Sequence, residues 1–231
     1  MRVRRMMIGL GVGGGGAAAT AFGLHRVYRW LRTWGAEPDE IGAALPGDEL
    51  CPAAAVVHSR AISVHAPPGE VWPWLTQIGQ DRSGFYSYAC LENGVGCRMP
   101  RVHERRAEWS TRAVGDKVLM AAPGRFGGKA YNVIAAVHPG LALVAVAPPD
   151  PPRIARSESA EWVWQLVVEP GALIGTSRLI ARSRYLPRQL WLEPIHFVME
   201  RKMLRTIAEL ASVPTPPMTE SEIGPPLAAH R

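Results

Sequence analysis

The chain has 231 residues, 47% of them hydrophobic, and a formal net charge of +6. This length and composition allow one substantial buried core, so we expect one main domain with appended segments. Much of the positive charge lies in residues 1–32, where six arginines meet no carboxylate. A nucleic-acid groove needs basic residues along a folded face, so we expect no nucleic acid as a partner. The distribution favours contact with a membrane surface instead.

Residues 6–24 contain no charged side chain, and 19 residues of helix just cross a bilayer core of about 30 Å. We predict that residues 1–34 form a single-pass N-terminal membrane anchor followed by a basic juxtamembrane helix. Two alternatives stay open: a cleaved signal peptide, which would make the protein secreted, and a flexible tail. The Gly9–Gly14 match to a dinucleotide-binding pattern lacks the strand that this pattern requires, so we expect no cofactor.

The rest of the chain alternates between structured segments and proline-rich connections. Residues 35–54 are predicted to be a linker, and residues 213–231, with five prolines, a disordered tail. The main domain is predicted to span residues 55–212. Its predicted elements are a strand at 56–66, a helix from Pro68, a second helix from Phe85, strands at 116–121, 129–137, 141–147, 161–169 and 175–185, and a long helix at 190–211. This order predicts an α+β fold in which an antiparallel sheet wraps around the C-terminal helix. The apolar face of this helix is predicted to consist of Leu192, Ile195, Met199, Met203, Thr206 and Leu210.

The chain resembles a bacterial branch of the START-like (SRPBCC, polyketide cyclase/dehydrase-like) superfamily through five strings in the family's order: APPGEVWPWLTQIGQDRSGFYSY, LENGVG, Glu108-Trp109, VGDKV and PIHFVMERKMLR. The resemblance implies a helix-grip fold with an apolar cavity between the sheet and the helix. Members of this branch often carry a hydrophobic N-terminal segment. Superfamily members bind lipids, sterols or polyketides, and a few catalyse cyclisation or dehydration, so the fold alone does not decide the function.

The predicted function is a membrane-associated binding module for an apolar small molecule, either lipid-like or polyketide-like. On the strand at 161–169, Trp162 and Trp164 share a face with Leu166 and Val168, and this face is predicted to point at the long helix. The two tryptophans would be the wall of an open cavity or the core of a filled one. The candidate ligand-binding residues are Trp74, Tyr86, Tyr88, Glu92, Asn93, Trp162, Trp164, Met199 and Met203.

Two alternatives from other functional classes stay open. One is a cyclase or dehydratase that uses Tyr88 and Glu92, which are helical neighbours at this spacing. However, Ala89-Cys90 stands where the family usually has an acidic residue, which weakens the enzyme hypothesis. The other alternative is a structural domain with a filled core.

The remaining polar patterns predict no further site. We expect no metal, because the Glu193-x-x-His196 pattern of di-iron helices occurs once and has no second copy. His196 and Glu200 are predicted to form a surface pair. Arg178, Arg182 and Arg184 share a strand face that is predicted to point to solvent, the alternative being a contact with a ligand carboxylate.

Overall fold

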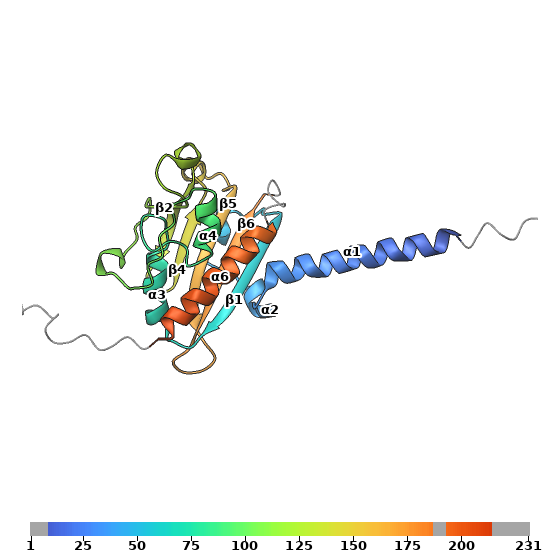
Figure 1. The fold of residues 1–231 in the computed structure, drawn as a ribbon, viewed down its shortest axis with the longest axis horizontal. Coiled ribbons are helices and arrows are strands. Elements are labelled where there is room, and N and C mark those ends of the chain that lie inside the picture. The colour runs from blue at the N-terminus through green and yellow to red at the C-terminus, as the bar shows by residue number, and fades with distance from the viewer. Residues whose placement is uncertain (1–8, 187–192, 214–231) are drawn as a thin grey trace, which may run out of the picture.

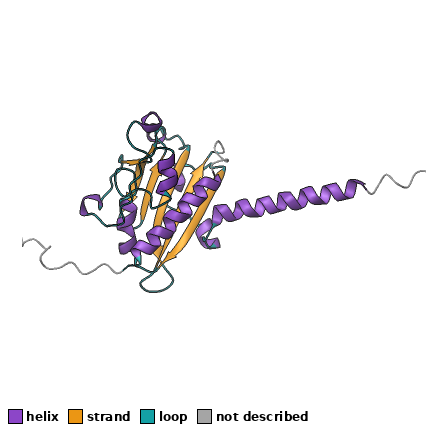
Figure 2. Cartoon of the chain, in the orientation of Figure 1, coloured by secondary structure: helices purple, strands orange, loops and turns teal. Residues whose placement is uncertain are grey.

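The computed structural model describes residues 9–186 and 193–213. Within these ranges, six strands form one antiparallel sheet in the order β1-β6-β5-β4-β3-β2, and helix α6 lies across one face of it (Figures 1 and 2). The predicted α+β fold, an antiparallel sheet gripping a C-terminal helix, is confirmed. The hydrophobic N-terminal helix is α1, which projects away from the sheet (Figure 1).

The predicted strands and the long C-terminal helix are present with small changes of boundary. The strands are β1 (Val56–Val64), β2 (Lys117–Leu119), β3 (Tyr131–His138), β4 (Ala142–Val146), β5 (Trp162–Pro170) and β6 (Ser177–Tyr185). The helices are α1 (Gly9–Thr33), α2 (Pro38–Gly42), α3 (Pro68–Thr76), α4 (Ala89–Gly94), α5 (Asp150–Ala155) and α6 (Glu193–Ala211), with three 3-10 turns, η1 (Asp48–Leu50), η2 (Ala107–Trp109) and η3 (Arg125–Gly128).

The inner face of the sheet, which is covered by α3 and α6, carries the main hydrophobic core. Trp164, Leu166 and Val168 of β5 lie in this core together with Met203 and other residues of α6. The predicted orientation of the β5 aromatic face toward the long helix is therefore confirmed. The alternation of side chains along β5 was sufficient for this prediction because the whole strand is regular.

The buried face of α6 differs in part from the predicted apolar stripe, which consisted of Leu192, Ile195, Met199, Met203, Thr206 and Leu210. Met203 and Thr206 are buried, but Ile195 is 59% exposed, and Leu192 lies outside the described residues. Glu193 and Glu200 are buried instead, together with Phe197. The prediction at Ile195 was wrong because the two glutamates, one heptad apart, face inward. Glu193 meets His58 of β1 and Arg32 of α1, and Glu200 meets Arg60 of β1.

The outer face of the sheet is also covered, which corrects the prediction for the arginines of β6. Arg182 is 1% exposed rather than solvent-facing, because α2 and η1 cross this face. Its guanidinium donates to Asp48 at 2.8 Å and to the carbonyl oxygens of Glu40 and Ala43 at 2.6 and 2.7 Å. The predicted linker at residues 35–54 thus packs on the sheet, and its polar groups satisfy buried arginine donors.

The C-terminal end of α1 packs against β1 and α6. The Trp34 carbonyl oxygen accepts a hydrogen bond of 3.1 Å from the N–H of Ala61 on the edge strand β1, and the Trp30 ring lies 5.0 Å from that of Phe197 on α6. In the part of the chain that the structure describes, no helix combines the length and the apolar composition that a membrane span requires. The predicted tail beyond Val213 lies outside the described residues, and the predicted domain boundaries stay predictions.

Candidate functional site

Four of the predicted ligand-binding residues meet in the interior between the sheet and α6. Trp74 of α3, Tyr86, Trp164 of β5 and Met203 of α6 belong to one buried cluster. The rings of Trp74 and Tyr86 are 6.0 Å apart in an edge-to-face arrangement. Phe85, which the sequence analysis did not single out, lies 6.2 Å from Trp164. The structure therefore assembles an aromatic interior from three separate segments of the chain.

Space inside this interior is small. A cavity of about 10 Å³ lies beside Trp164, which is at the lower limit of the volume that one water molecule needs. Its lining is apolar apart from one arginine and consists of Leu75, Ile78, Arg112, Val118, Ile134, Leu143, Ala145, Trp164 and Leu166. The sequence left two roles open for Trp164, the wall of an open cavity or part of a filled core. In the described conformation Trp164 is part of the buried core. Trp162 is partly buried and stacks on Trp164 with a ring separation of 6.4 Å.

Arg112 is the charged side chain at the cavity, and sequence analysis missed it. Its guanidinium donates to the carbonyl oxygens of Thr76, Ile78 and Lys117, and so ties the end of α3 to β2. Burial lowers the pKa of Arg112 to about 10, with the neighbouring Arg82 contributing in the same direction. These backbone contacts occupy the guanidinium, which indicates a structural role.

The segment of residues 84–88 closes the interior on the side of α6. The predicted second helix from Phe85 was wrong at its start, because Tyr86 has a φ of +53° and α4 begins at Ala89. The Tyr86 hydroxyl accepts a long hydrogen bond of 3.4 Å from Gln77, and burial raises the pKa of Tyr86. Ser87 Oγ donates to the carbonyl oxygen of Met199 at 2.7 Å, which fastens this segment to α6.

The remaining predicted site residues lie outside this cluster. Tyr88 is 38% exposed, and among the described residues no hydrogen bond joins its hydroxyl to Glu92. The Asn93 side chain holds the backbone of Met99 through its amide donor, at 3.1 Å, and its carbonyl acceptor. Glu92 Oε2 is buried and has no hydrogen-bond partner among the described residues, and burial raises the pKa of this carboxyl group. Glu92 also lies near the Cys97 thiol, whose pKa is raised by burial and then by that carboxylate.

A buried ionic cluster, which the sequence pattern did not predict, lies along the N-terminal half of α6. It joins α1, β1, β6 and α6 and consists of Arg32, His58, Arg60, Tyr185, Glu193 and Glu200. Arg32 Nε lies 2.5 Å from Glu193 Oε1, and Arg60 Nη1 lies 2.5 Å from Glu200 Oε2. Two arginines thus face two glutamates, which compensates for the cost of removing each charge from water.

His58 is the neutral member of the ionic cluster. Arg60 Nη2 faces His58 Nδ1 at 3.3 Å, so this nitrogen must accept, and Nε2 carries the ring proton. Nε2 then donates to Glu193 Oε1 at 2.8 Å. Burial, followed by the charge of Arg60, lowers the pKa of His58 to about 3. Burial also raises the pKa of Tyr185, whose hydroxyl lies 3.0 Å from the same Nε2, to about 12.

Glu200 connects the ionic cluster with the aromatic interior. Its Oε1 accepts a hydrogen bond of 3.1 Å from Trp164 Nε1, while Oε2 meets Arg60. Burial alone would raise the pKa of Glu200, yet His196 and Arg60 hold it below its ordinary value. The predicted surface pair of His196 and Glu200 was therefore wrong for Glu200, which is 4% exposed. The signal that could have revealed the cluster is the presence of His58 and Arg60 on the same strand face as Val64, which lies in the core.

The chain is similar to known proteins in its fold. No protein-family model matches the chain, and no curated protein matches it. A protein of solved structure from Nitrosospira multiformis aligns over 67% of this chain and 94% of its own, at 14% identity and a TM-score of 0.41. Norcoclaurine synthase from Thalictrum flavum aligns over 75% and 96%, at 14% identity and a TM-score of 0.39.

A polyketide-cyclase-like protein from Corynebacterium glutamicum is also similar, over 68% of this chain and 90% of its own, at 13% identity and a TM-score of 0.34. At these identities and TM-scores no activity is carried over from any of the three proteins. The helix-grip fold is established by the chain's own strand order and by the position of α6.

Proposed function

We propose that the domain binds an apolar small molecule, lipid-like or polyketide-like, in the interior between the sheet and helices α3 and α6. The observation that carries this proposal is the composition of the interior, where aromatic and aliphatic side chains surround the cavity beside Trp164. Binding pockets for small molecules are lined mainly by apolar groups with a few polar ones. The polar groups at this interior include Arg112, which lines the cavity, the Tyr86 hydroxyl, and the Glu200 carboxylate that accepts from Trp164 Nε1.

Binding requires the interior to open, because small-molecule pockets measure about 300–1,000 Å³. We propose that the segment of residues 84–88 is the part of the wall that moves when a ligand enters. It lies outside helix and strand, and it is fastened to α6 through the hydrogen bond from Ser87 to Met199. Its Phe85 ring lies against Trp164, so displacement of this ring would extend the cavity along the aromatic side chains.

Removal of the Phe85 ring tests the proposal. In Phe85→Ala the ligand no longer has to displace a ring, so we expect at least a fivefold gain in affinity for the uncharged fluorophore N-phenyl-1-naphthylamine. Phe126→Ala is the matched control, because Phe126 is 54% exposed on η3 and its loss should leave the affinity unchanged. Native mass spectrometry of the full chain from its source should show a co-purified apolar molecule. If neither the unmodified chain nor Phe85→Ala binds the fluorophore, although both unfold cooperatively, the domain is a structural one with a filled core.

The enzyme alternative depends on Glu92, whose Oε2 atom is buried and finds no hydrogen-bond partner in the part of the chain that the structure describes. A buried carboxyl group with a raised pKa is a candidate general acid. Tyr88 does not pair with it, and the aromatic cluster of the interior contains neither residue, so we favour binding without catalysis. Turnover of a polyketide or lipid substrate that Glu92→Gln abolishes, with the unfolding transition retained, would establish the enzyme instead.

We also propose that residues 6–24 hold the protein at a membrane. The support is the absence of charged side chains from this stretch and the exposed Tyr28 and Trp30 that follow it, since both residue types favour the membrane–water interface. The full chain should resist carbonate extraction, whereas a chain that begins at His25 should be released. Carbonate extraction of the full chain would contradict the proposal, and a mature N-terminus near Phe22 would support the secreted alternative.

A further inference from the structure

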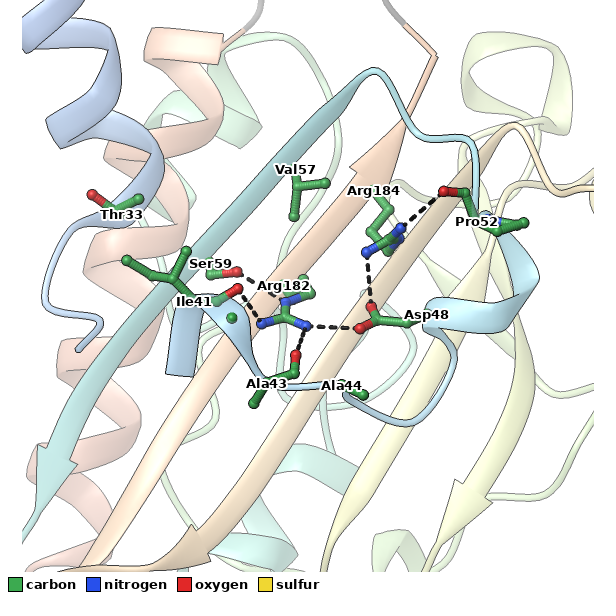
Figure 3. Close-up of a pocket in the computed structure, with 11 residues that line it drawn as sticks. Thr33, Ile41, Ala43, Ala44, Asp48, Pro52, Val57, Ser59, Arg182 and Arg184 are labelled. Carbon is green, nitrogen blue, oxygen red and sulfur yellow. Dashed lines mark hydrogen bonds and ion pairs between the residues drawn. The ribbon is translucent and has the colours of Figure 1, made fainter. Parts of the chain in front are cut away.

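We infer that the outer face of the sheet carries a second binding site, for a free monoanionic amphiphile such as a short-chain carboxylate. A hollow of about 530 Å³ lies between β1, β6 and the segment of residues 41–52 (Figure 3). This volume is within the usual range for small-molecule pockets. Val57 and Ser59 of β1 line the hollow, and side chains alternate along a strand, so it lies across the sheet from His58, Arg60 and the proposed interior site.

The charge at the hollow favours a single negative charge on the ligand. Arg182 and Arg184 both line it, and Asp48 lies between them, 2.8 Å from Arg182 Nη1 and 3.3 Å from Arg184 Nη1 (Figure 3). The neighbouring Glu40 carboxylate is occupied by Arg178 at 2.6 and 2.7 Å. Two guanidinium groups and one carboxylate leave one uncompensated positive charge among the groups that line the hollow.

Among the described residues, Arg184 has N–H groups that no acceptor engages. The N–H groups of Arg182 are engaged by Ser59, Asp48 and three backbone carbonyl oxygens. Arg184 donates to the carbonyl oxygens of Cys51 and Pro52, at 3.1 and 3.4 Å, and meets Asp48. A guanidinium has five N–H donors, so among the described residues at least two of those on Arg184 have no acceptor. A carboxylate can accept from two guanidinium donors at once.

The walls of the hollow suit an apolar body attached to that charge. Ile41 on α2 is 40% exposed, and Val57 on β1 is 36% exposed, so two large apolar side chains line the open space. An alkyl chain between them would remove this apolar surface from water, which is favourable by about 25 cal/mol per Å². An uncharged amphiphile would leave the Arg184 donors unpaired, and a cationic one would be repelled.

Octanoate is the probe for this site, with octanol and octylammonium as its uncharged and cationic counterparts. We expect octanoate to shift the backbone amide resonances of Val57 and Ser59 in the full chain, and the other two compounds to bind at least tenfold more weakly. Arg184→Gln should weaken octanoate binding at least tenfold, and Arg184→Lys should retain part of it. Ile41→Ser, which leaves the arginine contacts in place, should weaken binding about threefold, because one apolar wall is lost.

Arg156→Gln is the control, because Arg156 is an exposed arginine beside α5 that pairs with Glu158, away from the hollow. It should bind octanoate as the unmodified chain does. Shifts at Phe85 and Trp164 instead of Val57 and Ser59 would overturn the inference and would place the ligand in the interior. Equal binding of octanoate and octanol would also overturn it. Binding to phosphatidylglycerol vesicles without binding to octanoate would identify the partner as a lipid surface and would contradict the site for a free ligand.

Discussion

Arg60 and Arg182 lie almost side by side on neighbouring strands, yet they point to opposite faces of the sheet. Arg182 pairs in register with Ser59, the residue next to Arg60. Both side chains are buried, with exposures of 0% and 1%. On the inner face, Arg60 meets one carboxylate, that of Glu200. On the outer face, Arg182 distributes its hydrogen bonds over Asp48, Ser59 and backbone carbonyl oxygens.

The difference between these two arginines shows two ways of burying a positive charge. On the inner face the one carboxylate is that of Glu200. The other partners of Arg60 include the carbonyl oxygen of Leu31 and the ring of His58. On the outer face Arg182 has three backbone carbonyl oxygens, the Ser59 hydroxyl and a carboxylate that is itself shared with Arg184. We therefore expect loss of Glu200 on the inner face to reduce the free energy of unfolding strongly. Loss of a single partner on the outer face should reduce it less.

The largest effect should come from Glu200→Leu. This substitution leaves Arg60 buried without its carboxylate and removes the acceptor of the Trp164 N–H. Breaking a buried ion pair from one side costs about 3–5 kcal/mol of unfolding free energy. Urea denaturation monitored by circular dichroism measures this loss. The double variant Arg60→Met with Glu200→Leu should regain most of it, and a double variant as unstable as Glu200→Leu would contradict the pairwise explanation.

The second effect is a pH dependence that arises from His58. Its pKa is about 3 in the folded chain, against an ordinary value of 6.5. Between these values the unfolded chain binds a proton that the folded chain does not, so stability falls as the pH drops from about 6.5 toward 3. From pH 6 to pH 4 the loss should be about 2–3 kcal/mol.

His58→Gln should make the slope of this pH profile shallower, although His196, whose pKa is also lowered by burial, still contributes to it. The exposed His138→Gln should leave the profile as it is in the unmodified chain. The comparison uses the slope of unfolding free energy against pH, so a general destabilisation by either substitution does not affect it. An unchanged slope in His58→Gln would show that His58 is not the titrating group.

Arg182→Met on the outer face should have a smaller effect. The substitution removes donors from Asp48 and from carbonyl oxygens of the segment that contains α2, but Asp48 keeps Arg184, and methionine fills part of the space. We expect a loss of about 2 kcal/mol in the urea midpoint analysis. A loss equal to that of Glu200→Leu would remove the proposed difference between the two faces.

The smallest effect should come from Ile195→Ser on α6. The sequence pattern placed Ile195 in the buried stripe, whereas its side chain is 59% exposed. Surface substitutions usually change stability by less than about 0.5 kcal/mol. A loss of 2 kcal/mol or more in the same urea measurement would indicate that Ile195 is covered in solution.

Regular elements were predictable from this sequence, and contacts between distant polar residues were not. The alternation of side chains from Trp162 to Val168 predicted both the strand and the side chains on its inner face, because a period of two is typical of a strand. The prediction of a helix from Phe85 was wrong because Tyr86 has a positive φ. Tyrosine rarely adopts such a φ, so the sequence gives no indication of it. The ionic cluster joins residues up to 161 positions apart, which no local pattern records.

The junction between α1 and the sheet is fixed by a glycine. Gly35 has a φ of +71°, and a methyl group added to it would lie 2.1 Å from the carbonyl oxygen of Ala61. Any other residue at this position would have to push the end of α1 away from β1. Helix α1 has 25 residues and is therefore about 37 Å long, so a turn of about 10° at Gly35 would carry its far end about 6 Å sideways. The direction of helix α1 is thus set by the absence of one methyl group.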